Sequence, residues 1–189
     1  MKKWLPLIII VAVIGVPLLM AMGTYNTLVS KQEAARTTWS QVENQYQRRF
    51  DLIPNLVETV KGFAKQEREV LTEVTRLRSQ WGEARATGNI GQAQQAARGL
   101  EAALSRLLLV VERYPQLKSN ENFLRLQDQL EGTENRISVE RRRYNLSVQD
   151  YNTQIRRFPS NLLASMLGFN RMQLFEAEEG AGKAPKVKF

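Results

Sequence analysis

A run of twenty residues without a charge, Trp4 to Gly23, constrains this chain more than any other feature. A helix that crosses a bilayer needs about 20 apolar residues, because its backbone is satisfied internally and nothing in the hydrocarbon solvates a charge. Trp4 and Tyr25 lie at the two ends of the run, and at 1.5 Å per residue they are about 31 Å apart, close to the thickness of the hydrocarbon core. The sequence therefore predicts a transmembrane helix over residues 4–23, after a short flank at residues 1–3.

A cleaved signal peptide is the alternative interpretation of this run. Lys2 and Lys3 provide a charged start, and the small residues Ala21 and Gly23 have the spacing of a cleavage site. The apolar stretch is long for a signal peptide, which favours an uncleaved, single-pass anchor. Because the two lysines precede the run, the positive-inside rule favours a cytoplasmic amino terminus in the inner membrane, with the bulk of the chain facing the periplasm or the cell exterior.

The composition removes most catalytic and metal chemistry. The chain has no Cys and no His, so it lacks zinc sites built from these residues, Ser-His pairs and Cys-His pairs. It also lacks the glycine-rich motifs that bind nucleotides. We therefore expect no enzyme, no cofactor and no metal. The formal net charge of +8 suggests attraction to anionic lipid head groups rather than to nucleic acid, although a solvated basic surface is an equally good explanation.

After the anchor, apolar residues recur every three or four positions, which is the pattern of packed helices and of coiled coils. We expect an all-α fold: an antiparallel up-and-down bundle over residues 24–175, followed by a flexible tail at residues 176–189. Three breaks divide the pattern. They lie at Thr87-Gly88-Asn89, at Tyr114-Pro115 with Lys118-Ser119-Asn120, and at Phe158-Pro159-Ser160.

Pro54 leaves two topologies open. If the chain reverses there, four helical segments of comparable length form a four-helix bundle, at about residues 25–52, 54–84, 90–114 and 119–158. If Pro54 only kinks the helix, the first helix is very long and half of it lacks a partner of matching length. The lengths favour a reversal.

The last long helix and the segment after it hold the candidate contact residues. In the bundle topology the basic end of this helix returns to the membrane end, where its arginines would face lipid head groups or pair with acidic neighbours. Residues 160–175 include a short amphipathic helix that would lie in the membrane interface or plug the end of the bundle. The candidate membrane or partner contacts are Arg141, Arg142, Arg143, Arg156, Arg157, Leu162, Leu163, Met166, Leu167 and Phe169.

Two Tyr-Asn dipeptides, Tyr144-Asn145 and Tyr151-Asn152, lie seven residues apart on one helical stripe. A third, Tyr25-Asn26, lies near the start of the first helix. Buried Asn residues at a helix seam would set register and pairing. Placement on the surface is the alternative.

The chain resembles the LemA family over nearly its whole length. The matching stretches are Tyr25–Val29, Trp39–Val42, Arg48–Val57, Tyr114–Lys118, Asn120–Phe123, Leu130–Ile137, Arg142–Asn145, Tyr151-Asn152, Phe158-Pro159, Phe175-Glu176 and Pro185–Phe189. The resemblance implies a bacterial, membrane-anchored protein with an α-helical bundle. The family brings no agreed biochemical activity, so no active site is transferred.

Two functions follow from these expectations. The first is a membrane-anchored binding or scaffold protein of the cell envelope, without catalysis, that holds an unidentified membrane or envelope protein. The second is a lipid-contacting or membrane-remodelling protein that uses the basic helix end and residues 160–175. The lipid bilayer is a partner in both, nucleic acid in neither, and a homo-oligomer is compatible with either.

Overall fold

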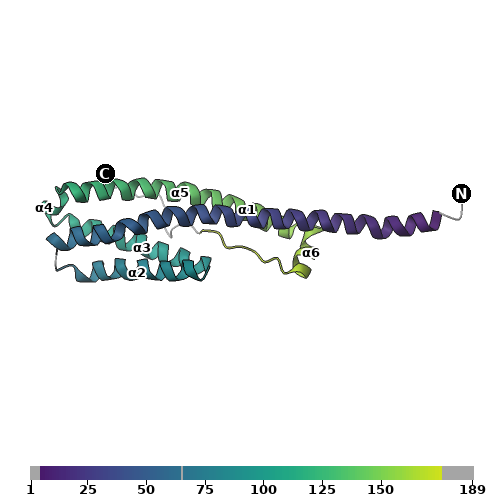
Figure 1. Ribbon diagram of the computed structural model, residues 1–189, viewed down its shortest axis with the longest axis horizontal. Coiled ribbons are helices and arrows are strands. Elements are labelled where there is room, and N and C mark those ends of the chain that lie inside the picture. The colour runs from purple at the N-terminus through teal and green to yellow at the C-terminus, as the bar shows by residue number, and fades with distance from the viewer. Residues whose placement is uncertain (1–4, 65, 176–189) are drawn as a thin grey trace, which may run out of the picture. The chain divides into compact units, whose positions relative to one another are not determined.

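The computed structural model describes residues 5–64 and 66–175, and side chains from residue 11 onward. This described part contains six helices and no strand (Figure 1), which confirms the all-helical fold. The helices are α1 (Leu5–Phe63), α2 (Arg68–Ala86), α3 (Ile90–Val111), α4 (Pro115–Lys118), α5 (Glu121–Arg156) and α6 (Ser160–Leu167). The predicted flank at residues 1–3 and the predicted tail at 176–189 lie outside the described residues.

The reversal at Pro54 that the segment lengths favoured is wrong, because α1 continues through this residue to Phe63. A proline inside a helix has no N–H for the carbonyl four residues earlier, here that of Phe50. In this chain Arg78 of α2 donates from Nε to the Phe50 carbonyl oxygen over 3.2 Å. A side chain from another helix thus satisfies the acceptor that Pro54 leaves without a backbone partner.

The chain reverses instead at residues 64–67. Backbone bonds from Ala64 to the Val60 carbonyl and from Glu67 to the Ala64 carbonyl close the corner. The Glu67 carboxylate accepts from Arg113 Nη2 at 3.0 Å and from the Tyr114 hydroxyl at 3.2 Å. This turn contains no proline. The Arg113 and Tyr114 side chains that donate to the Glu67 carboxylate come from a distant part of the chain.

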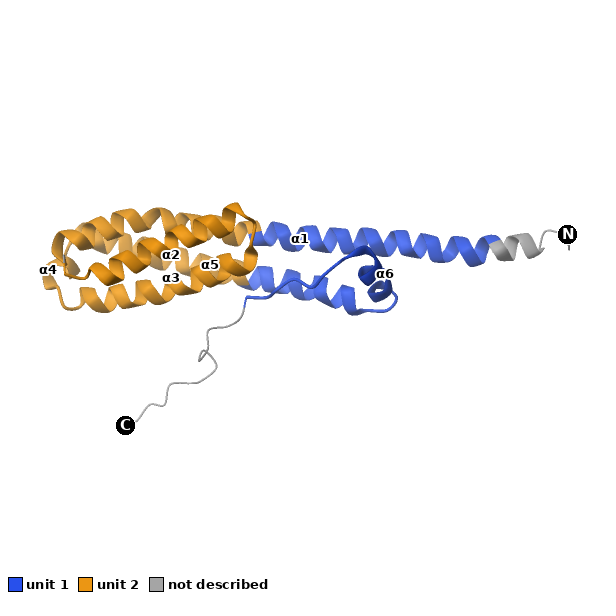
Figure 2. Ribbon diagram, turned by 90° about the horizontal axis from the view of Figure 1, so that it is seen from below, with its two compact units in different colours: residues 1–39, 142–189 blue, residues 40–141 orange. Residues whose placement is uncertain are grey.

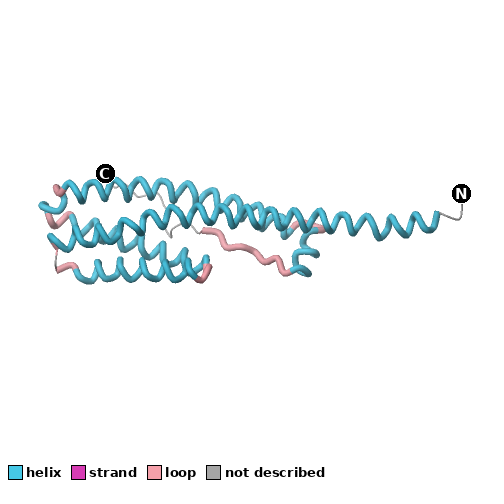
Figure 3. The backbone as a smooth tube through the Cα atoms, viewed as in Figure 1, coloured by secondary structure: helices cyan, strands magenta, loops and turns pink. Residues whose placement is uncertain are grey.

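The other predicted breaks are confirmed. Gly88 adopts a φ of 67° after α2, a left-handed conformation that favours glycine, and the Asn89 side chain then caps α3 by accepting from the Gln92 N–H. Asn120 accepts in the same way from the N–H groups of Asn122 and Phe123 at the start of α5. The loops in Figure 3 fall at these breaks, and a further loop follows α6.

The chain divides into two compact units (Figure 2). Unit 2 comprises residues 40–141: the last part of α1, all of α2, α3 and α4, and the first part of α5. The helices bury apolar side chains at the expected spacing, with α2 packed against α3. The largest buried side chains of this unit include Phe50, Ile53, Leu56, Trp81, Leu100, Leu107 and Phe123.

Unit 1 comprises residues 1–39 and 142–189, and its described part holds the first part of α1, the end of α5, α6 and an extended segment at residues 169–175. Its core contains Leu28, Ala35 and Trp39 from α1 with Tyr144, Val148 and Tyr151 from α5. A stripe of residues spaced by seven is buried along the whole of α5: Phe123, Leu130, Ile137, Tyr144 and Tyr151. The periodicity read from the sequence is therefore the core-facing stripe.

Candidate functional site

The first part of α1 carries an apolar surface that no described residue covers. Eight large apolar side chains between residues 11 and 22 are each more than half exposed: Val11, Val13, Ile14, Val16, Leu18, Leu19, Met20 and Met22. Only 6% of the most apolar window of this helix is buried, and its length and composition suit a membrane span. A contiguous exposed apolar surface of this kind marks a membrane or protein contact.

The α6 segment lies beside the end of that apolar run. The ring of Phe169 meets the ring of Tyr25 edge to face, with centroids 6.0 Å apart. On α6, Ala164 is buried, Leu163 is half-buried, and Leu162, Met166 and Leu167 are exposed. The structure therefore brings the predicted residues 162–169 together at one end of unit 1, and it leaves one face of α6 uncovered.

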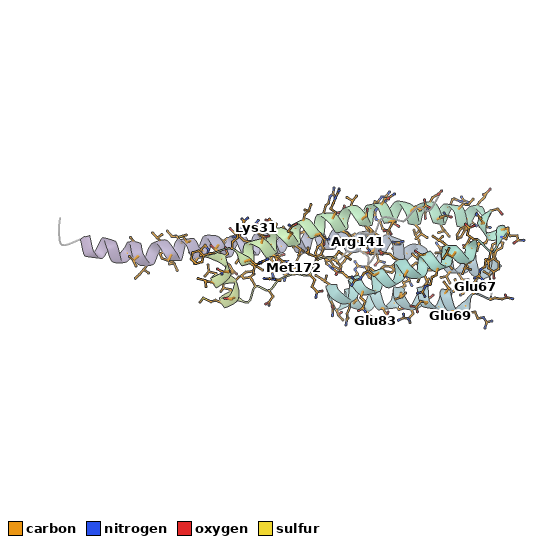
Figure 4. The ribbon with its side chains drawn as sticks, turned by 180° about the vertical axis from the view of Figure 1, so that it is seen from behind. Lys31, Glu67, Glu69, Glu83, Arg141 and Met172 are labelled. Carbon is orange, nitrogen blue, oxygen red and sulfur yellow. The ribbon has the colours of Figure 1, made fainter. Side chains whose placement is uncertain are left out.

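The predicted arginines separate into two groups. Arg142, Arg143, Arg156 and Arg157 belong to unit 1 and are exposed. Arg141 belongs to unit 2 and is partly buried, in contact with Glu101 and Tyr46. Arg141, labelled in Figure 4, thus pairs with an acidic residue of a neighbouring helix, as the alternative interpretation of these arginines expected.

Arg141 is part of a charged cluster inside unit 2. Its guanidinium donates to the Tyr46 hydroxyl and to the Glu101 carboxylate. Arg49, which is 7% exposed, pairs with Glu134 and lies 3.9 Å from Glu101. Two guanidinium groups and two carboxylates therefore compensate one another around a tyrosine that is almost fully buried.

Burial controls the ionisation of this cluster. It raises the pKa of Glu101, since desolvation penalises the carboxylate more than Arg141 stabilises it. Burial, with the nearby Glu101 carboxylate, also raises the pKa of Tyr46, so this phenol stays protonated. The alternative interpretation of the arginines expected an acidic partner for Arg141, but neither Arg49 nor Glu101 was identified from the sequence, because only the packed helices bring these residues together.

The two Tyr-Asn dipeptides of α5 hold the extended segment that follows α6. The Asn152 side chain pairs with the backbone of Met172, accepting from its N–H at 3.0 Å and donating to its carbonyl at 2.9 Å. Asn145 pairs with Phe175 in the same way, at 2.8 and 2.9 Å. The hydroxyl groups of the two tyrosines donate to the carbonyls of Asn170 and Gln173, Tyr151 to the former at 3.1 Å and Tyr144 to the latter at 2.9 Å. We call these four side chains the Tyr-Asn ladder.

The ring of Phe175 lies in an aromatic pocket at one end of the ladder. It stacks on Trp39 with a centroid distance of 5.6 Å and meets Tyr144 edge to face at 5.9 Å. Phe175 is buried, whereas Arg171, Gln173 and Leu174 are exposed. The ladder and its aromatic pocket therefore contact the backbone of the segment and one aromatic side chain.

A hollow of about 700 Å³ in unit 2 is lined by Val57, Leu71, Thr72 and Thr75, with Lys61, Arg68 and Arg76 around it. It contains no carboxylate and no candidate nucleophile beside a base. Within residues 5–64 and 66–175, no group of three acidic side chains is arranged to hold a metal ion.

The comparisons with known proteins agree with this architecture. The model of the LemA family matches residues 38–189. Magnetosome proteins MamQ 1 and MamQ 2 of Paramagnetospirillum magneticum are each 31% identical over 86% of this chain and 68% of their own length. Protein LemA of Metamycoplasma hominis is 22% identical over 94% of this chain and 80% of its own length.

The fold and the exposed apolar helix define a membrane-associated helical protein. The chain belongs to the LemA family, as the match over most of its length shows.

Proposed function

We propose that this chain is a membrane-anchored scaffold of the bacterial cell envelope that acts by binding and not by catalysis. The observation that carries the proposal is the exposed apolar surface of residues 11–22, which needs lipid to cover it. The charged cluster of unit 2 is compatible with a non-catalytic role, because Arg49, Glu101 and Arg141 pair within the bundle. Two relatives are named as magnetosome proteins, and a part in such a structure is compatible with a scaffold.

The proposal includes an orientation. The lysines at positions 2 and 3 would stay in the cytoplasm, and both units would lie on the periplasmic or outer side of the inner membrane. Cysteine labelling tests it, since the chain has no native Cys. An impermeant maleimide added to intact cells or spheroplasts should react with Leu109→Cys. Labelling only after the membrane is opened would reverse the orientation.

Crosslinking in native membranes, followed by mass spectrometry, tests the scaffold function. We expect one reproducible protein neighbour, crosslinked through the same residues in repeated preparations. The chain should also remain in the membrane pellet after alkaline carbonate extraction. Full release by carbonate, with a mature start near Thr24, contradicts the anchor, whereas a pellet without any protein neighbour contradicts the scaffold alone.

A second function, contact with the lipid surface, is favoured by α6. The Met166 side chain is 81% exposed, and it lies in the same unit as the apolar run. The described part of unit 1 outside that run, residues 24–39 and 142–175, carries seven basic and two acidic residues. An exposed apolar face beside basic side chains suits insertion into an anionic interface.

Fluorophore depth measurements separate this function from the scaffold. In full-length protein reconstituted into anionic vesicles, a fluorophore attached to Met166→Cys should be quenched by lipid-attached quenchers. Leu109→Cys is the matched control, because this apolar side chain of unit 2 is 71% exposed. Equal quenching by a water-soluble agent at both positions would remove lipid contact as a function of α6.

A further inference from the structure

The Tyr-Asn ladder has the periodicity of a site that reads an extended chain. Asn145 and Asn152 are separated by seven helical residues, which corresponds to about 10.5 Å at 1.5 Å per residue. Their partners Phe175 and Met172 are separated by three extended residues, which corresponds to about 10 Å. The two tyrosines repeat the same match with Asn170 and Gln173. Seven residues along the helix therefore cover about the same distance as three residues along the antiparallel extended segment.

This recognition depends little on which chain supplies the segment. Six hydrogen bonds connect the ladder to backbone groups, and only the Phe175 ring enters a pocket. Any extended segment with an aromatic residue at that position makes the same bonds. Residues 170–175 of a second copy of this chain meet that requirement by identity.

The segment is also placed for exchange. It lies outside every helix, and it follows Gly168, which ends α6 with a φ of 76°. A left-handed glycine at this point lets the chain change direction with little steric cost. Exchange of an identical segment between copies is an inexpensive route to association, because each new contact replaces the same contact within one copy.

The apolar helix of the same unit favours such an exchange. Copies anchored in one bilayer hold their ladders at the same height above it, because ladder and apolar run belong to one compact unit. Confinement to the membrane raises the effective concentration of one copy around another. A segment that leaves its own ladder therefore meets a neighbour's ladder at the right level.

We infer that the Tyr-Asn ladder is an exchangeable docking site, at which residues 170–175 of one copy bind α5 of a neighbouring copy and link the two in the membrane. The closed arrangement of the structure is the form of an isolated copy. Linked copies present several scaffolds side by side. The exchange requires only copies of this chain and no other protein, so its test is separate from that of the scaffold.

A complementation experiment with two full-length variants tests this exchange. The donor carries Asn145→Ala and Asn152→Ala, which remove four of the six hydrogen bonds of its ladder and leave its segment intact. The acceptor carries Phe175→Pro, which removes the aromatic ring and the N–H that donates to Asn145 Oδ1. Each variant carries a different affinity tag, and the two are reconstituted together in vesicles before detergent extraction.

We expect donor and acceptor to co-purify at least tenfold more than two donors or two acceptors. Adding Phe175→Pro to the donor should abolish the association. A donor with Gln149→Ala in place of the two Asn substitutions, an exposed position on α5, is the matched control and should associate less than the ladder donor. Co-purification no greater than that of identical pairs, or unaffected by Phe175→Pro in the donor, would overturn the inference.

A second measurement leaves every ladder side chain in place. Gln173 contributes only its carbonyl to the ladder, and Gln149 is exposed between the two Asn residues on α5. Copies with Gln173→Cys should crosslink through a short bifunctional maleimide to copies with Gln149→Cys. Gln95→Cys on α3 replaces Gln149→Cys in the control and should give only the collision background. An equal yield from both pairs would also overturn the exchange.

Discussion

The two units satisfy their buried polar groups in different ways. In unit 2 a buried cluster is built from charged side chains, in which Arg49 and Arg141 pair with Glu101 and Glu134. In unit 1 the Tyr-Asn ladder consists of neutral side chains. Their donors and acceptors form hydrogen bonds with backbone groups of a non-helical segment. A buried ion pair resists separation because each charge loses its partner, whereas neutral hydrogen bonds are exchanged for equivalent ones at low cost.

The surface charge follows the same division. Unit 2 has 15 basic and 14 acidic residues, and unit 1 has 12 basic and five acidic residues. Nearly all of the chain's net charge of +8 therefore belongs to the unit that contains the apolar run. Unit 2 is balanced as a bundle in water would be, whereas unit 1 has the composition of a surface that faces anionic lipid.

We expect the largest effect from charged substitutions in the apolar surface of unit 1. Ile14→Arg with Leu18→Arg places two charges in the predicted span, at a cost of about 5 kcal/mol on insertion scales. We expect much of the protein to leave the membrane pellet in alkaline carbonate. Leu109→Arg with Leu124→Arg, two exposed positions of unit 2, should leave the pelleted fraction unchanged. Equal behaviour of the two pairs would contradict the difference between the units.

The next effect concerns two neighbouring arginines in different units. Arg141→Met leaves Glu101 with one guanidinium at 3.9 Å, and we expect a loss of about 3 kcal/mol in the free energy of unfolding. Arg142→Met changes an exposed residue of unit 1 and should cost less than about 0.5 kcal/mol. Denaturant unfolding of both proteins in detergent measures the difference. Similar midpoints would mean that the charged cluster contributes little.

A smaller effect tests how unit 2 tolerates Pro54. Arg78→Met removes the donor to the Phe50 carbonyl and should cost about 1 kcal/mol. With Pro54→Ala the helix supplies its own N–H to that carbonyl, so the same Arg78→Met substitution should then cost much less. The coupling energy from the four proteins of this double-mutant cycle measures the interaction. Additive costs would show that Arg78 has another role.

The smallest effect concerns the ionisation of Tyr144. It leaves the free energy of unfolding unchanged at pH 7 and lowers it in alkali. Burial raises the pKa of Tyr144 to about 12 from an ordinary value of 10.0. A folded-state pKa above the unfolded value means that this stabilisation is complete below pH 10 and is lost as the pH rises toward 12. The absorbance of tyrosinate, compared between wild type and Tyr144→Phe, should show a component with a midpoint near pH 12. A midpoint near 10 would indicate an open ladder.

Sequence periodicity predicted the helical fold and the core because these depend on local pattern. The stripe Phe123, Leu130 and Ile137 is buried as its spacing predicts. The predicted breaks at Gly88 and Asn120 coincide with helix ends, since capping residues act on the nearest backbone groups. The predicted reversal at Pro54 was wrong, because the residue that donates to the Phe50 carbonyl in place of the missing N–H, Arg78, is 24 positions away in the sequence.

The candidate site was predictable only in part, for a related reason. The residues Leu162, Met166 and Leu167 form an exposed face on a short helix, as their spacing suggested. The Tyr-Asn dipeptides were visible as a repeat, but their partners are backbone groups, and a backbone group leaves no mark in the sequence. The partner of Arg141 was likewise not identified, because only the tertiary structure brings Glu101 to it.

The sequence alone determined what depends on near neighbours: an apolar run long enough for a bilayer, helices of defined period, and the breaks at Gly88, Pro115 and Pro159. The tertiary structure decided what depends on distant partners. It placed the turn at residues 64–67, satisfied the carbonyl opposite Pro54, buried Arg49 and Arg141 with their carboxylates, and set residues 170–175 on the Tyr-Asn ladder. Local pattern sets the cost of a helix at each position, but a polar group is stabilised only by the partner that folding brings to it.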